Sequence, residues 1–169
     1  NFAQSDHAAV DHVTIRSRDE KLRNNDGVNI DSSTNISVKD CDVISGDDAL
    51  VIKSTAAGKP SSHISAENCQ LSTRTNAIKL GTESIGGFSD ITISHCQITN
   101  TEMAGIALYE VDGGDLTNVV ISDVSMDNVQ VAIAARLGAR LKAFRDGDKP
   151  LPAPGHIHNV SIKNVSATN

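Results

Sequence analysis

Three aspartates stand at two places that the sequence pattern makes equivalent. Asp26 lies two residues before Val28. Asp48 lies two residues before Leu50 and directly follows Asp47. If these strand starts are neighbours in a sheet, the carboxylates emerge about 4.7–4.9 Å apart. Carboxylates so close cannot all ionise easily, which keeps one proton available beside an ionised partner. Such a set can protonate a leaving group and activate water, whereas the plainer interpretation is that Asp and Gly only form turns here.

The strands that would position these aspartates recur along the chain. Short runs alternate an inward apolar residue with an outward variable one, which is typical of half-buried strands. The first ladder of such runs is Val28–Ile30, Leu50–Ile52, Ile78–Leu80, Ile106–Leu108 and Ile133–Ala135. A second ladder begins at Ile36, Ile64, Ile91, Val119 and Val160, and Asp11–Ile15 looks like an earlier copy of it. Fixed periods of this length are the signature of stacked coils.

This repeat of about 27 residues predicts an all-β fold, a β-solenoid of the parallel β-helix type. The handedness rule for parallel crossovers makes it right-handed. No segment shows a sustained helical stripe, and no cap is evident at either end. We therefore expect one β-helix segment over residues 1–169, taken from the central or C-terminal part of a longer catalytic domain.

Composition narrows the possible partners. The net charge of −6 argues against nucleic acid, whose binding needs Lys and Arg to neutralise phosphates. No apolar run approaches membrane-spanning length, so we expect no membrane partner. Cys41, Cys69 and Cys96 recur at the same place on successive coils, which predicts a buried column and not a disulfide or a metal site. The sequence carries no signal for an oligomeric state.

The segments around the aspartates match a known pattern. Asn24–Gly27 reads Asn-Asn-Asp-Gly, and Gly46–Asp48 reads Gly-Asp-Asp one coil later. Together they resemble glycoside hydrolase family 28, the polygalacturonases and related pectin-cleaving enzymes, with Asn25 in place of a family Thr. The resemblance implies an inverting glycoside hydrolase that acts on pectic or related acidic plant polysaccharide, is secreted or periplasmic, and needs no metal or cofactor.

The resemblance also implies roles for the three aspartates. Asp47 would be the general acid, while Asp26 and Asp48 would hold and deprotonate the attacking water. Glycoside hydrolysis needs this combination of a protonated acid and a carboxylate.

Two later family motifs are altered. Asn76 stands where the family has the His of Gly-His-Gly. Ala107 and Tyr109 stand where it has the Arg and Lys of Arg-Ile-Lys. These replacements imply a divergent branch that cuts another pectic linkage or a side chain.

The outward positions of the first ladder predict a substrate groove, with Lys53, Lys79 and Arg136 as a local positive patch and Tyr109 stacking on a sugar ring. The predicted substrate-binding residues are Asn24, Lys53, Asn76, Lys79, Tyr109 and Arg136. Glu110 is a spare carboxylate near this groove. The basic, proline-rich segment 138–158 either covers the groove and binds an acidic chain or is a solvated loop.

Two alternatives from other classes stay open. A polysaccharide lyase or epimerase on the same solenoid would use a calcium-binding acidic cluster and a basic residue that abstracts a proton. A non-catalytic carbohydrate-binding solenoid would keep the corner aspartates by descent, and the missing family His, Arg and Lys favour it.

Overall fold

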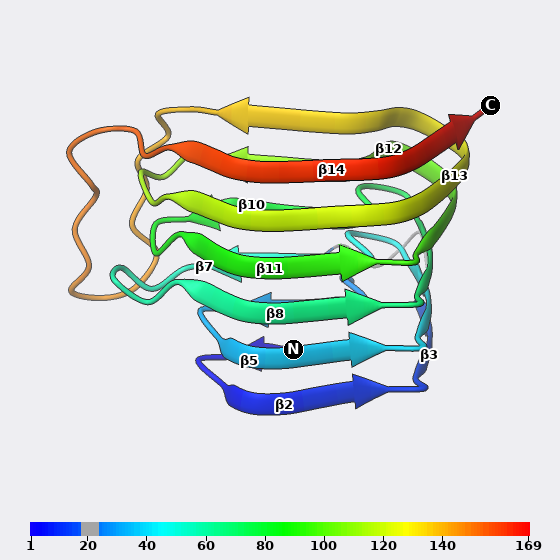
Figure 1. The fold of residues 1–169 in the computed structure, drawn as a ribbon. Helices are drawn as coiled ribbons and strands as arrows, with labels where there is room; N and C mark the ends of the chain where they lie inside the picture. Colours follow the sequence, from blue (N-terminus) through cyan, green and yellow to red (C-terminus); the bar gives the residue numbers. More distant parts are fainter. Residues whose placement is uncertain (18–23) are drawn as a thin grey trace.

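The computed structural model describes residues 1–17 and 24–169 of the chain. It confirms the predicted right-handed parallel β-helix, a solenoid of about five turns whose coils stack one above the next (Figure 1). All strand pairs in the described residues are parallel. In the same part of the chain, no helix has the length and apolar character needed to cross a membrane.

The described strands form three faces of the solenoid. Face one contains β1 (Phe2–Ala3), β4 (Val28–Asp31), β7 (Leu50–Ser54), β10 (Ile78–Ser84) and the later parts of β12 (Gln97–Glu110) and β13 (Leu116–Leu137). Face two contains β2 (Asp6–Asp11), β5 (Thr34–Lys39), β8 (Ser61–Glu67), β11 (Phe88–Ser94) and the first parts of β13 and β14 (Ile157–Thr168). Face three contains β3 (Thr14–Ser17), β6 (Asp42–Ser45), β9 (Gln70–Thr73), the first part of β12, the middle of β13 and the last part of β14.

Both predicted ladders are confirmed as columns of paired residues. In face one, Val28 pairs with Leu50, which pairs with Ile78, and the series continues through Ile106 to Ile133. In face two, the column runs through Ile36, Ile64, Ile91, Val119 and Val160. Their side chains fill the narrow interior, where Ile, Val and Leu are almost fully buried in the middle coils and more exposed in the first and last coils. This burial supplies the main driving force for the fold.

The predicted earlier copy at Asp11–Ile15 was wrong. Ile36 pairs with Ala8 in β2, and Ile15 pairs with Val43 in β3, on a different face. Thr14 and Ile15 do belong to a strand, β3, but alternation alone does not distinguish one face of a coil from another. His12 has a left-handed φ of 53° and forms the corner between the two strands.

The corners of the coils are marked by residues in the left-handed region. One column contains His7, Asn35, His63, Asp90, Asn118 and Asn159. The other contains His12, Asp40, Asn68, His95, Asp123 and Asn164. We call them the corner columns. Short polar side chains tolerate this backbone conformation because they hydrogen-bond locally. Asn118 Nδ2, for example, donates to Asp90 Oδ1 at 3.1 Å.

The three cysteines form the predicted column. All are buried and free. Each thiol donates to the carbonyl oxygen two residues before it, as Cys41 Sγ does to Lys39 O at 3.1 Å. The same bond recurs at Cys69 and Cys96. The column is therefore a packing feature of the core.

Residues 138–156 leave the end of face one and return to the start of β14, and we call this segment the strap. It extends beside the coils towards β7 and β8 (Figure 1). Arg145 Nη2 donates to Asp31 Oδ2 at 3.0 Å and to Thr55 Oγ1 at 2.7 Å. Ala57 N donates to Asp148 Oδ2 at 3.0 Å. The strap thus connects the last face-one strand to two coils much earlier in the chain.

Candidate active site

The structure brings the three predicted aspartates together. Asp26 precedes β4, and Asp47 and Asp48 precede β7, so all three lie at the corner between face three and face one. One carboxylate oxygen of each lies within 4.8 Å of the others. Gly27 N donates to Asp48 O at 2.8 Å, which fixes the two corners against each other. A Cβ at Gly27 would lie 2.4 Å from Ala49 O, so the close stacking of these corners requires glycine.

Asp48 is a buried carboxylate with every oxygen engaged, since the residue is only 2% exposed. Its Oδ1 accepts from Thr75 Oγ1 at 2.9 Å, Asn76 Nδ2 at 2.8 Å and Asn76 N at 3.2 Å. Its Oδ2 accepts from Lys79 Nζ at 2.7 Å. These contacts come from the next coil, and they compensate the cost of burying the charge.

Asp26 has a similar but more open set of partners. Its Oδ2 accepts from Asn29 Nδ2 at 2.7 Å and from Lys53 Nζ at 3.0 Å. Burial lowers the pKa of Lys53, but the hydrogen bond and the charge of Asp26 outweigh this effect and raise it. Lys53 therefore stays charged and neutralises Asp26.

Asp47 is bonded only to neutral donors in the part of the chain that the structure describes. Its Oδ1 accepts from Asp48 N at 2.9 Å and from Thr75 Oγ1 at 3.1 Å. Its backbone carbonyl accepts from Ser45 Oγ at 2.6 Å and from Thr73 Oγ1. The corner is thus held rigidly, while the Asp47 carboxylate has no ammonium or guanidinium partner among the described residues.

The two lysines do more than the sequence predicted. We expected Lys53 and Lys79 in a positive patch for the substrate, and the structure pairs both with carboxylates of the cluster. Two of the three carboxylates, those of Asp26 and Asp48, thus have an ammonium partner. This arrangement arises because both lysines lie on outward positions of face one, within reach of the corner.

Sequence reasoning missed Thr75 and Asn29. Thr75 lies 28 residues after Asp47, one coil further, so the repeat would have identified it. Asn29 lies three residues after Asp26, in β4. The predicted position of Asn76 in the column above Asp48 is correct.

The other predicted contacts lie apart from the cluster. Asn24 is exposed, with a φ of 55°, and no hydrogen bond joins it to the three carboxylates among the described contacts. Tyr109 and Arg136 are paired neighbours on face one. They line a separate cavity at the other end of these strands.

Glu110 does not lie in the groove, contrary to expectation. Glu110 is 0% exposed, and neither of its carboxyl oxygens has a hydrogen-bond partner within the described residues. It follows Tyr109 on β12 and alternates with it, so its side chain points into the coil. Burial raises the pKa of Glu110 to about 8. The group is therefore neutral at physiological pH.

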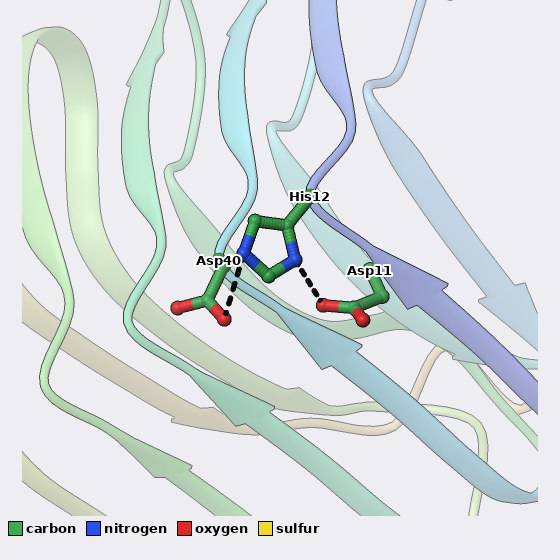
Figure 2. A group of neighbouring side chains, drawn as sticks. All are labelled: Asp11, His12 and Asp40. Carbon is green, nitrogen blue, oxygen red and sulfur yellow. Dashed lines mark hydrogen bonds and ion pairs between the residues drawn. The ribbon is translucent and has the colours of Figure 1, made fainter.

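A second group of titratable side chains lies at a corner between faces two and three (Figure 2). His12 Nδ1 lies 2.7 Å from Asp11 Oδ1, and His12 Nε2 lies 3.6 Å from Asp40 Oδ2. His12 and Asp40 are successive members of a corner column, where side chains bond to the coil above. The contacts are therefore those that the other members of the column make, as when Asn68 bonds to Asp40.

The fold places the chain in the class of right-handed parallel β-helices, and the sequence assigns it further. The family model described as glycosyl hydrolases family 28 matches residues 1–169. The chain therefore belongs to glycosyl hydrolase family 28.

Individual proteins support the assignment. A probable polygalacturonase of Vitis vinifera is 30% identical over 118 residues, which cover 64% of this chain and 24% of that protein. A polygalacturonase from Erwinia carotovora has a similar fold, with a TM-score of 0.71 and 22% identity over 99% of this chain and 49% of that one. A hyperthermoactive exopolygalacturonase from Thermotoga maritima also has a similar fold, with a TM-score of 0.72 and 22% identity. This match covers 97% of this chain and 37% of that one. The chain thus spans half or less of the length of each of these relatives.

Proposed function

We propose that the protein is an O-glycosyl hydrolase that cleaves a glycosidic bond in a pectic polysaccharide by direct attack of water. Family membership and the polygalacturonase relatives support this proposal. The observation that carries it is the geometry of the cluster, in which three carboxylates gather at one corner and two of them, among the described residues, have an ammonium partner.

We propose a different role for each of the three aspartates, and the hydrogen-bond partners of each support this division. Asp47 is the general acid, because it is the member without a cationic partner among the described residues. It donates its proton to the glycosidic oxygen while water attacks the anomeric carbon. Asp26 accepts a proton from that water, and the leaving sugar departs as an alcohol.

Asp48 serves to orient this machinery. It is 2% exposed, and both of its oxygens are occupied by Thr75, Asn76 and Lys79. The family pattern assigns Asp26 and Asp48 jointly to the water. We propose that Asp26 takes the proton from water, while Asp48 fixes the position of the corner through its bonds to Thr75, Asn76 and Lys79.

The paired lysines argue against a calcium-dependent lyase or epimerase. Such an enzyme holds a hard divalent cation with several carboxylate oxygens. Here Lys53 and Lys79 occupy one oxygen of Asp26 and one of Asp48. The two ammonium groups repel a divalent cation and leave it fewer free carboxylate oxygens than three unpaired aspartates would offer.

The first experiment incubates the protein with a panel of pectic polysaccharides and follows the release of reducing ends. Asp47→Asn is the matched variant, since it keeps the shape and removes the acid. We expect the parent to release reducing ends and the variant to lose about 10²–10⁴-fold in kcat, the usual contribution of a positioned acid. Equal rates for the parent and the variant would show that Asp47 is not the general acid. Unsaturated products would show that the protein is a lyase.

The site of action follows from the proposed substrate. Pectic polysaccharides lie outside cells, so we propose that the protein is secreted or periplasmic. Fractionation of the producing cells tests this placement, and activity confined to the cytosolic fraction would contradict it.

A further inference from the structure

The side chain of Thr75 joins two members of the carboxylate cluster. Thr75 lies between β9 and β10, at the corner one coil beyond Asp47 and Asp48. Its Oγ1 lies 3.1 Å from Asp47 Oδ1 and 2.9 Å from Asp48 Oδ1. No other side chain among the described residues forms a hydrogen bond with both of these carboxylates. Thr75 therefore connects the proposed acid directly to its buried neighbour.

Thr75 cannot donate to both carboxylates at once, because a hydroxyl has a single hydrogen. The two carboxylates differ in their other donors. Asp48 also accepts from Asn76 N, Asn76 Nδ2 and Lys79 Nζ. Within the described part of the chain, the Asp47 carboxylate has one other donor, Asp48 N at 2.9 Å. Asp48 thus stays well bonded without the hydroxyl of Thr75, whereas Asp47 depends on it.

The same contact orients the carboxyl group of Asp47. Its Oδ1 is held between Asp48 N and Thr75 Oγ1. Its Oδ2 has no hydrogen bond to a described residue, and Asp47 is partly exposed whereas Asp48 is buried. Oδ2 is therefore the oxygen of Asp47 that is available to a substrate.

The main chain of Thr75 is fixed by bonds that do not involve its hydroxyl. Thr75 N donates to Thr73 Oγ1 at 3.2 Å, and Met103 N donates to Thr75 O at 3.1 Å. These bonds connect the residue to its own coil and to the next one. A substitution at Thr75 should therefore remove the hydroxyl and leave the corner in place.

We propose that Thr75 is a positioning residue for the general acid, and that its hydroxyl turns from Asp48 to Asp47 as Asp47 ionises. Before cleavage, Asp47 carries the proton on Oδ2 and Thr75 donates to Asp48. During cleavage the Oδ2–H bond breaks, the proton goes to the glycosidic oxygen, and the electron pair stays on Asp47. The hydroxyl of Thr75 rotates about its Cβ–Oγ1 bond and donates to Oδ1 of the new carboxylate.

This rotation assists the chemical step and not the binding of substrate. A carboxylate accepts a stronger hydrogen bond than a neutral carboxyl group does, because it is charged. The bond from Thr75 to Asp47 therefore strengthens as the transition state is reached, and such an interaction raises kcat. The proposal rests on the proposed function and identifies a residue that assists its acid.

The first test measures kcat and KM on the pectic polysaccharide that the parent cleaves fastest. Thr75→Val removes the hydroxyl and keeps the shape, so kcat should fall about 10- to 100-fold, the effect of losing a hydrogen bond to a charged group. KM should change little, and Thr75→Ser, which keeps the hydroxyl, should restore most of kcat. Thr92→Val, at an exposed threonine of β11 on face two, is the matched control and should leave both constants unchanged.

A double variant separates this role from a structural one. In an Asp47→Asn background, Thr75→Val should lower the residual rate no further, because the hydroxyl acts through the carboxylate. A structural role would slow both backgrounds by the same factor, and that result would overturn the proposal. Thr75→Ala is a second variant without the hydroxyl, and circular dichroism checks that each protein keeps its strands.

A measurement without turnover separates this proposal from the proposed function. Carbon NMR follows the carboxyl signal of Asp47 as the pH is raised, and Asp47→Asn assigns that signal. A hydrogen bond to the charged form favours that form, so Thr75→Val should move the titration midpoint to higher pH and Thr75→Ser should return it.

The outcomes distinguish the two proposals. If the parent cleaves no polysaccharide but the midpoint moves, the hydrogen bond from Thr75 to ionised Asp47 stands and hydrolysis fails. If the parent is active and neither kcat nor the midpoint changes in Thr75→Val, the role of Thr75 is wrong and hydrolysis stands. Absence of both turnover and a moved midpoint overturns both proposals.

Discussion

Asp48 shows how a charge is accommodated in the interior of this solenoid. Its carboxylate is almost completely buried, and four donors from the next coil surround it. The ammonium of Lys79 is the only cation among them. Such a pair contributes little net stability when intact, but losing one partner is costly because the other charge stays buried.

We therefore expect Lys79→Met to lower the free energy of unfolding by about 3–5 kcal/mol, the usual cost of breaking a buried pair. Urea denaturation followed by circular dichroism measures the change. Lys53→Met should cost less, because Asp26 is more exposed than Asp48, with side-chain exposures of 11% and 2%.

A double variant distinguishes charge from packing. In Lys79→Met combined with Asp48→Asn, the buried charge is gone together with its partner, so much of the stability should return. A double variant as unstable as Lys79→Met alone would mean that the lysine acts by packing only.

The stereochemistry of the products is a second test at the residue scale. Inverting glycosidases usually separate their two carboxyl groups by about 6.5–9.5 Å to admit water. In this cluster one oxygen of each carboxylate lies within 4.8 Å of the others. This separation is shorter than that range, so the expectation of inversion rests on the family pattern and not on the distance. Proton NMR of the anomers formed at early times measures it, and a retained configuration would assign one aspartate as a nucleophile.

At the scale of the strands, the stability of the coils depends on the corner residues with left-handed φ values. It also depends on which side chains each strand directs into the interior. The corner columns place non-glycine residues at left-handed φ values, where Asn, Asp and His supply side-chain bonds to the next coil. β12 directs Glu110 into the interior without a described partner. Each feature gives a measurable effect on stability.

Asn118 tests the corner columns. It has a φ of 55°, bonds to Asp90 and accepts from Asn159. Asn118→Ala should destabilise the protein by about 1–2 kcal/mol, the cost of the left-handed conformation for a residue without local bonding. Asn118→Gly should cost less, because glycine adopts this conformation freely. Thermal unfolding of the two variants gives the comparison, and equal losses would locate the effect in the side-chain bonds alone.

Glu110 predicts a pH dependence of stability. Burial raises its pKa from 4.5 to about 8, so the folded state binds a proton more tightly than the unfolded state does. The unfolded state therefore loses its proton first. The stability from this group is fully present below pH 4.5, falls as the pH rises towards 8, and levels off above that.

Glu110→Gln should remove this component, so the variant gains stability over the parent as the pH increases from about 5 to 8. Denaturation midpoints at several pH values measure the difference between the two proteins. The nearest polar groups, Ser84 and Asp112, are retained in both, so their effects largely cancel. A constant difference across the window would mean that Glu110 is already ionised in the fold.

At the scale of the whole molecule, much of the fold followed from the spacing of apolar residues. A period near 27 residues placed Val28, Leu50 and Ile78 in one column, and this alone put Asp26 beside Asp48. Pattern could not assign Asp11–Ile15 to a face, because every face of a coil alternates in the same way. Side chains that reach across coils, as Lys79 does to Asp48, depend on rotamers and charge that a repeat does not encode.

The strap has a consequence for how the molecule unfolds. In a solenoid each repeat touches only its neighbours, so repeats can unfold in separate steps. The contacts of Arg145 with Asp31 and Thr55, and of Asp148 with Ala57, couple coils that are not adjacent. Replacing Arg145 and Asp148 by alanine should broaden the denaturant transition and lower its m-value. An unchanged m-value would mean that adjacent coils alone make unfolding cooperative; a lower one would show that the strap makes distant turns unfold as a single unit.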